Sequence, residues 1–548
     1  MKFEALQTRI AELCNDTKIP YGTFTPELWE ESLRLLHQMT HLQSVPSLDC
    51  SCGFMDRLVI EMDTQQQQQI HKNSDHLPKL TTASLNAVVK NWNKCWKSVK
   101  PEEGYSNMLT PPEMLSRVDD WLYRLDSDAN NNANAQILRP DAATYGMILQ
   151  GALLRHTDSK AASVFGEKLF LRMVEESKGN NWVNVYPDKM TYTNMVHFHC
   201  KQGNLRRAEW YLHKMSWEYG RGNRAVKPTQ AVVESIMKAY SDMAVGNDGS
   251  DNHNKEHIPP RVLAERAENM LRTVQQNSGP FPNLQANRYM YAQVLKCWVF
   301  SMDSGTSTGT YPRALSSSDK EALNRVCHLY SEMEHNHDPK LQPDGHTLYL
   351  VLQAFCRARD GKGAQEVFDK YVENLKQSKE MENPRKSPDT FCFRQLASAW
   401  GEMTHPRAVE KIERLIEQMK SEEFVCAKPD VFVYNALLAC LIEQSPKKGG
   451  TIGPQCERML DEMITEHSIK PNTATYNLCL QGHAKDGQDP YLAEAMLERL
   501  YEVYLADGSA EPTVRTFNLV LNSWAESSND TAPTRVGKTP YSKVMLDM

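Results

Sequence analysis

Two short stretches of the chain place hydrogen-bonding side chains in the same order. Residues 428–438 read KPDVFVYNALL, and residues 470–480 read KPNTATYNLCL. Each has a proline, a small polar residue, an aromatic residue and then an asparagine. Short carboxylate and amide side chains can either cap the start of a helix or bind a ligand through hydrogen bonds. Asn435, Asn472 and Asn477 stand at these positions, so the first question is which of the two roles they have.

Other residues that could do chemistry do not form a recognisable site. Residues 197–200 read HFHC in an expected helix, where adjacent side chains point to different faces, so we favour packed side chains over a zinc site. His253 and His257 offer only two ligands in a polar segment. The GKG at 361–363 lacks the full phosphate-loop pattern and is expected to be a turn. The sequence therefore predicts no metal and no cofactor.

Composition limits the class of protein. The chain has 548 residues, too many for one ordinary core, with 40% hydrophobic and 24% charged residues. It has no apolar run long enough to span a membrane. Its net charge of -7 counts against strong non-specific binding to nucleic acid. The thirteen cysteines include no Cys-x-x-Cys pair, which fits a reduced compartment better than a disulfide framework.

A proline followed by a small polar residue recurs along the chain. The sites are Pro140-Asp141, Pro187-Asp188, Pro228-Thr229, Pro282-Asn283, Pro343-Asp344, Pro388-Asp389, Pro429-Asp430, Pro471-Asn472 and Pro512-Thr513. The gaps between successive prolines are 47, 41, 54, 61, 45, 41, 42 and 41 residues. Four of the eight gaps are 41 or 42, which indicates a repeat with insertions in the middle of the chain.

Each repeat has the pattern of a helical hairpin. A large apolar residue follows the proline by five residues in most units: Tyr145, Tyr192, Val233, Leu348, Phe393, Tyr434, Tyr476 and Phe517. In the fifth repeat it is displaced, and Tyr291 follows Pro282 by nine residues. A second amphipathic stretch carries a mostly small residue and, seven residues later, a large one, as in Ala208 and Met215. Seven residues are about two helical turns, so both lie on one face.

Such hairpins bury their apolar faces only by stacking. The sequence therefore predicts an all-α fold, an α-solenoid of stacked helix-turn-helix repeats that form a right-handed superhelix. The expected segments are an N-terminal helical segment with a glutamine-rich loop (1–79), a first divergent repeat (80–141), the repeat array (142–513) and a last, incomplete repeat (514–548). Polar insertions are expected near 244–260 and 301–319. Recurring tryptophans are expected to pack in the core: Trp121, Trp210, Trp298, Trp400 and Trp524.

Several of these stretches resemble pentatricopeptide repeats. The similarity is strongest in PDKMTYTNMVHFHCKQGNLRRAEWYLHKM, PDVFVYNALLACL and PNTATYNLCLQGHAKDGQ, and it covers about residues 81–548. The Pro-Asp mark and the later Thr-Tyr-Asn order match that family better than the tetratricopeptide family. The units are about six residues longer than the family's usual unit, and in this they resemble its divergent forms in algae and other protists.

The resemblance implies a single-stranded RNA-binding protein that reads one base per repeat with two side chains. One is the residue after the first-helix aromatic, and the other is the residue after the next proline. By analogy with the family, Asn with Asp favours uracil and Asn with Asn favours cytosine. The candidate base-reading residues are Asn86 with Asp141, Thr193 with Thr229, Asn435 with Asn472, Asn477 with Thr513, and Asn518 without a partner.

The middle repeats depart from the family's pattern. Their first reading position holds Glu234, Ala292, Tyr349 and Arg394, so two reading segments are expected to flank a middle that does not read by hydrogen bonds. Helix capping alone explains Asp, Asn or Thr after proline. It does not explain asparagine within a helix, where this residue is a mediocre former.

The resemblance implies an adaptor in organellar RNA processing, stability or translation, located in a mitochondrion or plastid. We expect no enzyme activity, no membrane partner and no small-molecule substrate. The first twenty residues are not acid-poor, as a transit peptide would be. The alternative is an α-solenoid scaffold that binds proteins without base-specific RNA recognition, which the acidic balance and the divergent middle repeats favour.

Overall fold

The structure is a computed structural model of the whole chain, and it separates into two units. It describes residues 8–9, 12–13, 25–39, 55–61, 82–98, 111–126, 140–154, 159–178, 185–246, 258–276, 284–302, 316–403, 405–421, 423–424, 426–445, 451–465, 469–486 and 489–527. The first unit comprises Met1–Ile258 with Arg272–Gln285, and the second comprises Pro259–Leu271 with Ala286–Met548. Each unit is considered by itself below.

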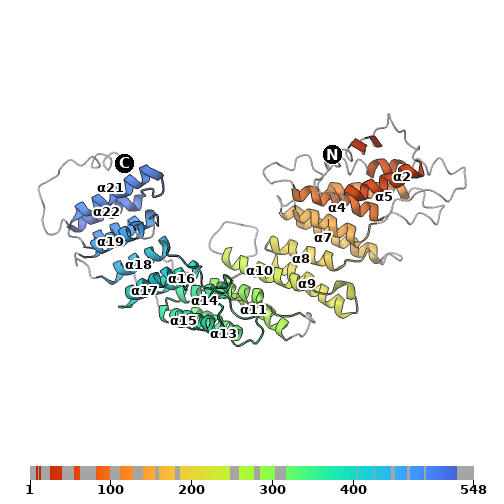
Figure 1. The fold of residues 1–548 in the computed structure, drawn as a ribbon. Helices are drawn as coiled ribbons and strands as arrows, with labels where there is room; N and C mark the ends of the chain where they lie inside the picture. Colours follow the sequence, from red (N-terminus) through yellow and green to blue (C-terminus); the bar gives the residue numbers. More distant parts are fainter. Residues whose placement is uncertain are drawn as a thin grey trace, which may run out of the picture. The chain divides into compact units, whose positions relative to one another are not determined.

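Helices make up the first unit, in red to yellow in Figure 1. They are α2 (Pro26–Met39), α4 (Thr82–Ser98), α5 (Pro111–Asp126), α6 (Ala142–Leu154), α7 (Ser159–Lys178), α8 (Lys189–Lys201), α9 (Leu205–Gly220), the short 3-10 helix η3 (Arg224–Val226) and α10 (Gln230–Gly246). Helix α11 (Pro260–Gln275) belongs mostly to the second unit.

The second unit continues the same alternation, in green to blue in Figure 1. Its helices are α12 (Arg288–Phe300), α13 (Ser317–Glu334), α14 (Gly345–Arg357), α15 (Gly361–Ser378), α16 (Thr390–Gly401), α17 (Ala408–Lys420), α18 (Val431–Gln444), α19 (Ile452–Thr465), α20 (Thr473–Asp486), α21 (Pro490–Asp507) and α22 (Val514–Ser527). The described part of the chain contains no β-strand, so the all-α prediction is confirmed.

Local capping explains where many of the helices begin. Asp188, Asp344 and Asp389 have extended backbones, and each side chain accepts a hydrogen bond from the backbone N–H three residues later. Asp430 caps α18 in the same way, through the N–H groups of Phe432 and Val433. The preceding proline ends the previous segment because it cannot continue a helix. The Pro-Asp mark is thus the start signal of a hairpin.

Consecutive first helices pack on one another and form a row. In the first unit, α4 contacts α6, α6 contacts α8, and α8 contacts α10; in the second, α12, α14, α16, α18, α20 and α22 follow in the same way. Each second helix lies between two first helices in the chain; the second helices are α5, α7, α9, α11, α13, α15, α17, α19 and α21. All of them except α11 pack against one or both of these first helices. This arrangement, with the first helices in a row in each unit and the second helices packed against them, is a helical-repeat solenoid.

The core consists of the residues that the repeat pattern singles out. The first-helix residues Tyr145, Tyr192, Val233, Tyr291, Leu348, Phe393, Tyr434 and Tyr476 are all buried. In the second helices, Ala208, Met215, Ala364, Tyr371, Ala493 and Leu500 are also buried. Burying one such large side chain contributes about 1.5–3 kcal/mol. Gly361, in the first turn of α15, lies so close to α16 that a Cβ there would be 3.0 Å from Trp400, so the GKG forms a tight helix start rather than a phosphate loop.

The fifth repeat and the recurring tryptophans test the expectations from the sequence. The fifth-repeat first helix, α12, is capped by Asn287, whose side chain accepts from Met290 N, so its start follows the displaced Tyr291 rather than Pro282. Trp298 and Trp400 are buried as expected, but Trp210 is 45% exposed. The glutamine-rich loop, most of both insertions, the His253 and His257 pair and residues 528–548 lie outside the described residues. No helix in the described chain is long and apolar enough to cross a membrane.

Candidate nucleic-acid interface

The two predicted reading positions of a repeat lie next to each other in three of the hairpins. Asn86 on α4 donates from Nδ2 to both carboxylate oxygens of Asp141, at 3.2 and 3.3 Å. Asn435 on α18 donates to Asn472 Oδ1 at 3.5 Å, the outer limit of a hydrogen bond. Between first helices α16 and α18, Arg394 forms an ion pair with Asp430. The packing of successive first helices therefore brings the two positions together.

The second position has a capping role in every such pair. Asp141 accepts from Thr144 N at 2.8 Å, and Asn472 accepts from Thr475 N at 3.0 Å. Asp430 accepts from Phe432 N at 3.0 Å. Because capping alone would keep these residues in place, the first position carries more information about a ligand than the second.

Other predicted pairs are not joined by a hydrogen bond within the described residues. Thr193 donates its hydroxyl to the backbone carbonyl of Lys189 at 2.7 Å and makes no bond to Thr229. Thr513 shares a hydrogen bond with Thr516 Oγ1 at 3.1 Å, and no bond links it to Asn477. Asn518 is exposed on α22. These residues stay candidates from the sequence pattern alone.

The three asparagines that the structure buries or half-buries differ in how well their amides are satisfied. Asn86 is satisfied at both ends, because Thr144 Oγ1 donates to its Oδ1 at 2.6 Å. In contrast, the buried Oδ1 atoms of Asn435 and Asn477 have no hydrogen-bond partner. Asn477 is only 9% exposed. A buried amide oxygen without a donor costs about 1–3 kcal/mol, so neither atom is explained by the stability of the hairpin.

Exposed aromatic side chains lie beside the polar pairs, and the sequence reasoning did not single them out. Phe391 and Phe432, both 54% exposed, follow the caps Asp389 and Asp430 by two residues. The Arg394 guanidinium lies 4.9 Å from the Phe391 ring centroid and 4.2 Å from that of Phe432. An aromatic residue in the first helical turn, at a position that faces solvent, was the available signal.

This row continues onto α14. Tyr349 meets Phe391 edge-on with ring centroids 6.4 Å apart, and His346 stacks on Tyr349 at 6.2 Å. We call His346, Tyr349, Phe391, Arg394 and Phe432 the aromatic row. Rings and guanidinium planes are the groups on which nucleobases stack. Two of the four middle repeats, those of Tyr349 and Arg394, thus have stacking groups at these positions.

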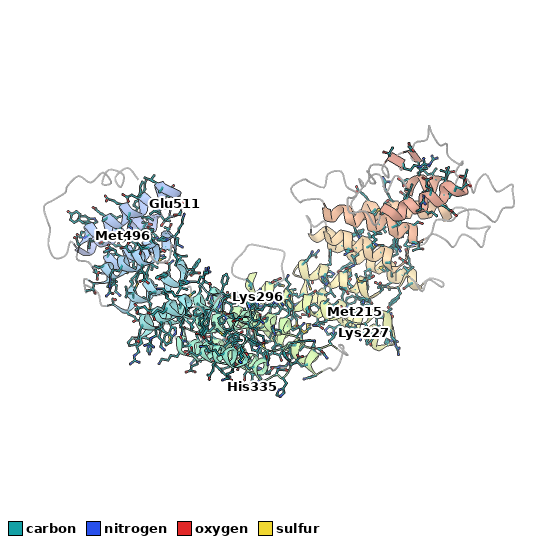
Figure 2. All side chains as sticks on the ribbon, viewed as in Figure 1. Met215, Lys227, Lys296, His335, Met496 and Glu511 are labelled. Carbon is teal, nitrogen blue, oxygen red and sulfur yellow. The ribbon has the colours of Figure 1, made fainter. Side chains whose placement is uncertain are left out.

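In each first helix, the residue four positions after the first reading position is not a carboxylate. Residues four apart on a helix share one face. These residues are Lys90, Gln150, His197, Lys238, Lys296, Gln353, Ser398, Ala439, Gln481 and Asn522. Lys296 on α12 is labelled in Figure 2. This stripe is neutral or cationic although the chain has a net charge of -7, and such a stripe suits a phosphate backbone.

The HFHC segment on α8 does not form a metal site. His199 is buried and its ring stacks on Tyr211 with centroids 5.3 Å apart. Burial, and then the charge of Arg207, lower the pKa of His199 to about 4, although Glu167 lies 3.8 Å from its Nε2. Burial raises the pKa of the Cys200 thiol to about 12. No group of three or more potential metal ligands occurs among the described residues.

Comparisons with known proteins address the type of repeat. No protein-family model matches the chain. A segment of 148 residues is 23% identical to a pentatricopeptide repeat-containing protein of Arabidopsis thaliana, and it covers 27% of this chain and 23% of that protein. The match therefore spans less than a quarter of the relative's length.

Two solved structures are also similar. One is the pentatricopeptide repeat protein PPR10 in complex with an 18-nt psaJ RNA element, and the other is a cysteine-substituted form of PPR10 with the same element. Each has 15% sequence identity and a TM-score of 0.35, with 96% of this chain and 69% of that chain covered. The 41- to 42-residue period, the stacked hairpins and the sequence similarity to the Arabidopsis protein make the chain similar to pentatricopeptide repeat proteins.

Proposed function

We propose that the chain binds single-stranded RNA along the row of first helices and acts without an active site of its own. The observation that carries this proposal is the pairing of Asn435 with Asn472, next to the unpaired buried oxygens of Asn435 and Asn477. Short amide side chains on the neighbouring first helices α18 and α20 are suited to the donor and acceptor groups of a base edge. The solved RNA complexes of PPR10 are in line with this choice of ligand.

The asparagine positions and the aromatic row have different roles in binding RNA. The asparagine positions on α4, α18 and α20 read bases by hydrogen bonds, whereas the aromatic row on α14, α16 and α18 holds bases by stacking and tolerates any sequence. The cationic or neutral stripe contacts phosphates. We place this binding in an organelle, where it serves RNA processing, stability or translation.

A selection experiment tests the proposal. The full chain is incubated with a randomised single-stranded RNA pool, and bound sequences are recovered by filter binding. We expect an enriched motif that relaxes at one position in Asn435→Ala, with an affinity loss of about 1–3 kcal/mol for the preferred base. Glu366→Ala on the outer side of α15 is the matched control and should keep the motif.

Two results would count against the proposal. If the motif is the same for the wild type and Asn435→Ala, base reading by this position is wrong. If the wild-type chain does not bind RNA even at low salt, where phosphate contacts are strongest, RNA binding itself is wrong. Microscopy of the tagged protein with organelle markers checks the organellar part, and an even cytosolic signal contradicts it.

A further inference from the structure

The outward side of the second helices is polar in almost every repeat but carries two tryptophans in α9. Relative to the small buried residue, the positions two and nine residues later point away from the first helices, since each residue advances about 100° around the helix. In α9, where the buried residue is Ala208, these positions are Trp210 and Trp217, 45% and 55% exposed. Met215, labelled in Figure 2, is buried on the opposite side of α9.

The corresponding positions show how unusual this pair is. They are Lys168 and Glu175, Asn269 and Gln276, His328 and His335, Glu366 and Glu373, Arg414 and Ser421, Arg458 and Thr465, and Ala495 and Glu502. None of these seven repeats has a tryptophan, tyrosine, phenylalanine or large aliphatic residue at either position. Stacking of the repeats therefore does not require tryptophan there, and about half of each tryptophan remains exposed in the described fold.

The neighbouring second helix extends the same surface. Val164 and Leu171 on α7 are 50% and 57% exposed and also point outward. Helices α7 and α9 lie side by side, because Phe170 meets Tyr211 with ring centroids 5.1 Å apart. We call Val164, Leu171, Trp210 and Trp217 the outer apolar face.

Cations surround this face. Lys214 Nζ lies 5.2 Å from the Trp210 ring and the Arg221 guanidinium 4.5 Å from the Trp217 ring. No ion pair in the described chain engages Lys214 or Arg221, nor the nearby Lys168 and Arg224. Apart from Glu175 at an outward position of α7, the charged residues named beside this apolar face are cations, in a chain with a net charge of -7. The complement of this face is apolar and acidic.

The shape points to a helix as the bound element. On each of α7 and α9 the two apolar residues are seven apart, about 10.5 Å along the axis. A helix with apolar side chains at i, i+3 or i+4, and i+7 presents the same spacing. Val164 and Leu171 offer nothing to a stacked nucleobase, and each indole already has one face covered by its own cation. These features favour a protein ligand over RNA.

We propose that the outer apolar face binds an acidic amphipathic helix of a partner protein, independently of RNA binding on the first helices. The tryptophans act as the anchors, as large aromatic residues commonly do at the centre of an interface. Lys214 and Arg221 contact carboxylates at the rim of the bound helix. The chain would thereby hold an RNA on one side and a protein on the other.

A displayed library of 16-residue helical peptides tests this proposal. The library is selected on the full chain, with counter-selection on the Trp210→Ala/Trp217→Ala variant. We expect enriched peptides that are acidic and have apolar residues at the i, i+3 or i+4, and i+7 spacing. A synthetic peptide with the enriched sequence should bind the double variant at least tenfold more weakly in fluorescence anisotropy. The Lys214→Glu/Arg221→Glu variant should bind the peptide more weakly than the wild type does. This loss of affinity should be larger at low salt than at high salt, because salt screens the charges.

Leu505→Ala is the matched control, because Leu505 is also exposed on a second helix but lies outside this face. It should leave peptide binding unchanged, and circular dichroism should show equal helix content for all variants. The proposal is overturned if no peptide depends on the two tryptophans, if the enriched peptides are basic, or if the double variant loses RNA affinity rather than peptide affinity.

Discussion

Asn477 offers the sharpest separation of stability from binding. Its side chain is only 9% exposed, makes no hydrogen bond within the described chain, and leaves a buried Oδ1 without a donor. An amide in this state contributes no hydrogen-bond stability to the hairpin. Asn477→Ala should therefore change the free energy of unfolding by no more than about 1 kcal/mol, because the lost contacts are offset by removal of an unsatisfied polar atom.

Asn194 provides the comparison, because it is a buried asparagine whose side chain does make a hydrogen bond. Asn194 on α8 is similarly buried, but its Nδ2 donates to the carbonyl of Gly146 at 3.1 Å. Asn194→Ala removes this hydrogen bond, while the Gly146 carbonyl keeps its partner within α6, so the substitution should cost about 0.5–1.5 kcal/mol. The two substitutions delete the same atoms, so the difference between them isolates the hydrogen bond. Urea denaturation of both variants, followed by circular dichroism, measures it.

RNA binding should show the opposite order. Asn477→Ala should weaken binding of the selected RNA by about 1–3 kcal/mol, which is a factor of about 5 to 150. Asn194→Ala should not change the affinity while the chain stays folded. A large loss of stability in Asn477→Ala would show that its amide has a structural partner in solution. An unchanged affinity would refute the reasoning that an unsatisfied amide marks a reading position.

Three further predictions concern other parts of the chain. Phe432→Ala should lower RNA affinity by about 1–3 kcal/mol through lost stacking. Because Phe432 is 54% exposed, the free energy of unfolding should change by less than about 0.5 kcal/mol. Filter binding measures the affinity with Leu505→Ala as the control, and equal affinities of the two variants would contradict the prediction. Because the pKa of His199 falls to about 4 on folding, the unfolded chain binds the extra proton between pH 6.5 and 4. The chain should therefore lose about 2 kcal/mol of stability from pH 7 to 5, and His199→Leu should lose less; identical slopes would reject this account. Burial raises the pKa of Cys440 to about 11, so alkylation by iodoacetamide at pH 8 should be about a hundredfold slower than in denaturant, and mass spectrometry showing equal rates would contradict it.

The repeat architecture could be predicted from the sequence because local rules and packing agree there. The same Asp or Asn that ends a proline turn also caps a helix, as Asp188 and Asp430 show. The small and large residues seven apart, such as Ala208 and Met215, mark the buried side of the second helix. In the fifth repeat, where the helix does not start at the proline, the displaced Tyr291 still indicates the start that Asn287 caps.

The contacts of the candidate site could not be predicted in the same way. Sequence spacing identifies Asn435 and Asn477 as equivalent, yet the Asn435 amide contacts the next repeat and the Asn477 amide makes no hydrogen bond among the described residues. That difference depends on the distance between neighbouring first helices, which insertion lengths and core side chains set together. The arrangement of Arg394 between two phenylalanines likewise needs three residues from two repeats.

The residue at the second position caps a helix and is also a candidate base contact, so its substitution affects both folding and RNA binding. Removing Asp141 or Asn472 would remove a helix cap, worth about 0.5–2 kcal/mol, together with any contact to a base. A loss of binding in such a variant therefore has two explanations. Asn477, at the first position, does not cap a helix. Asn435, also at the first position, makes one side-chain hydrogen bond among the described residues, the 3.5 Å contact to Asn472. Substitutions at the first position are for this reason the ones whose effect on RNA affinity reports on recognition, whereas substitutions at the second report on folding and recognition together.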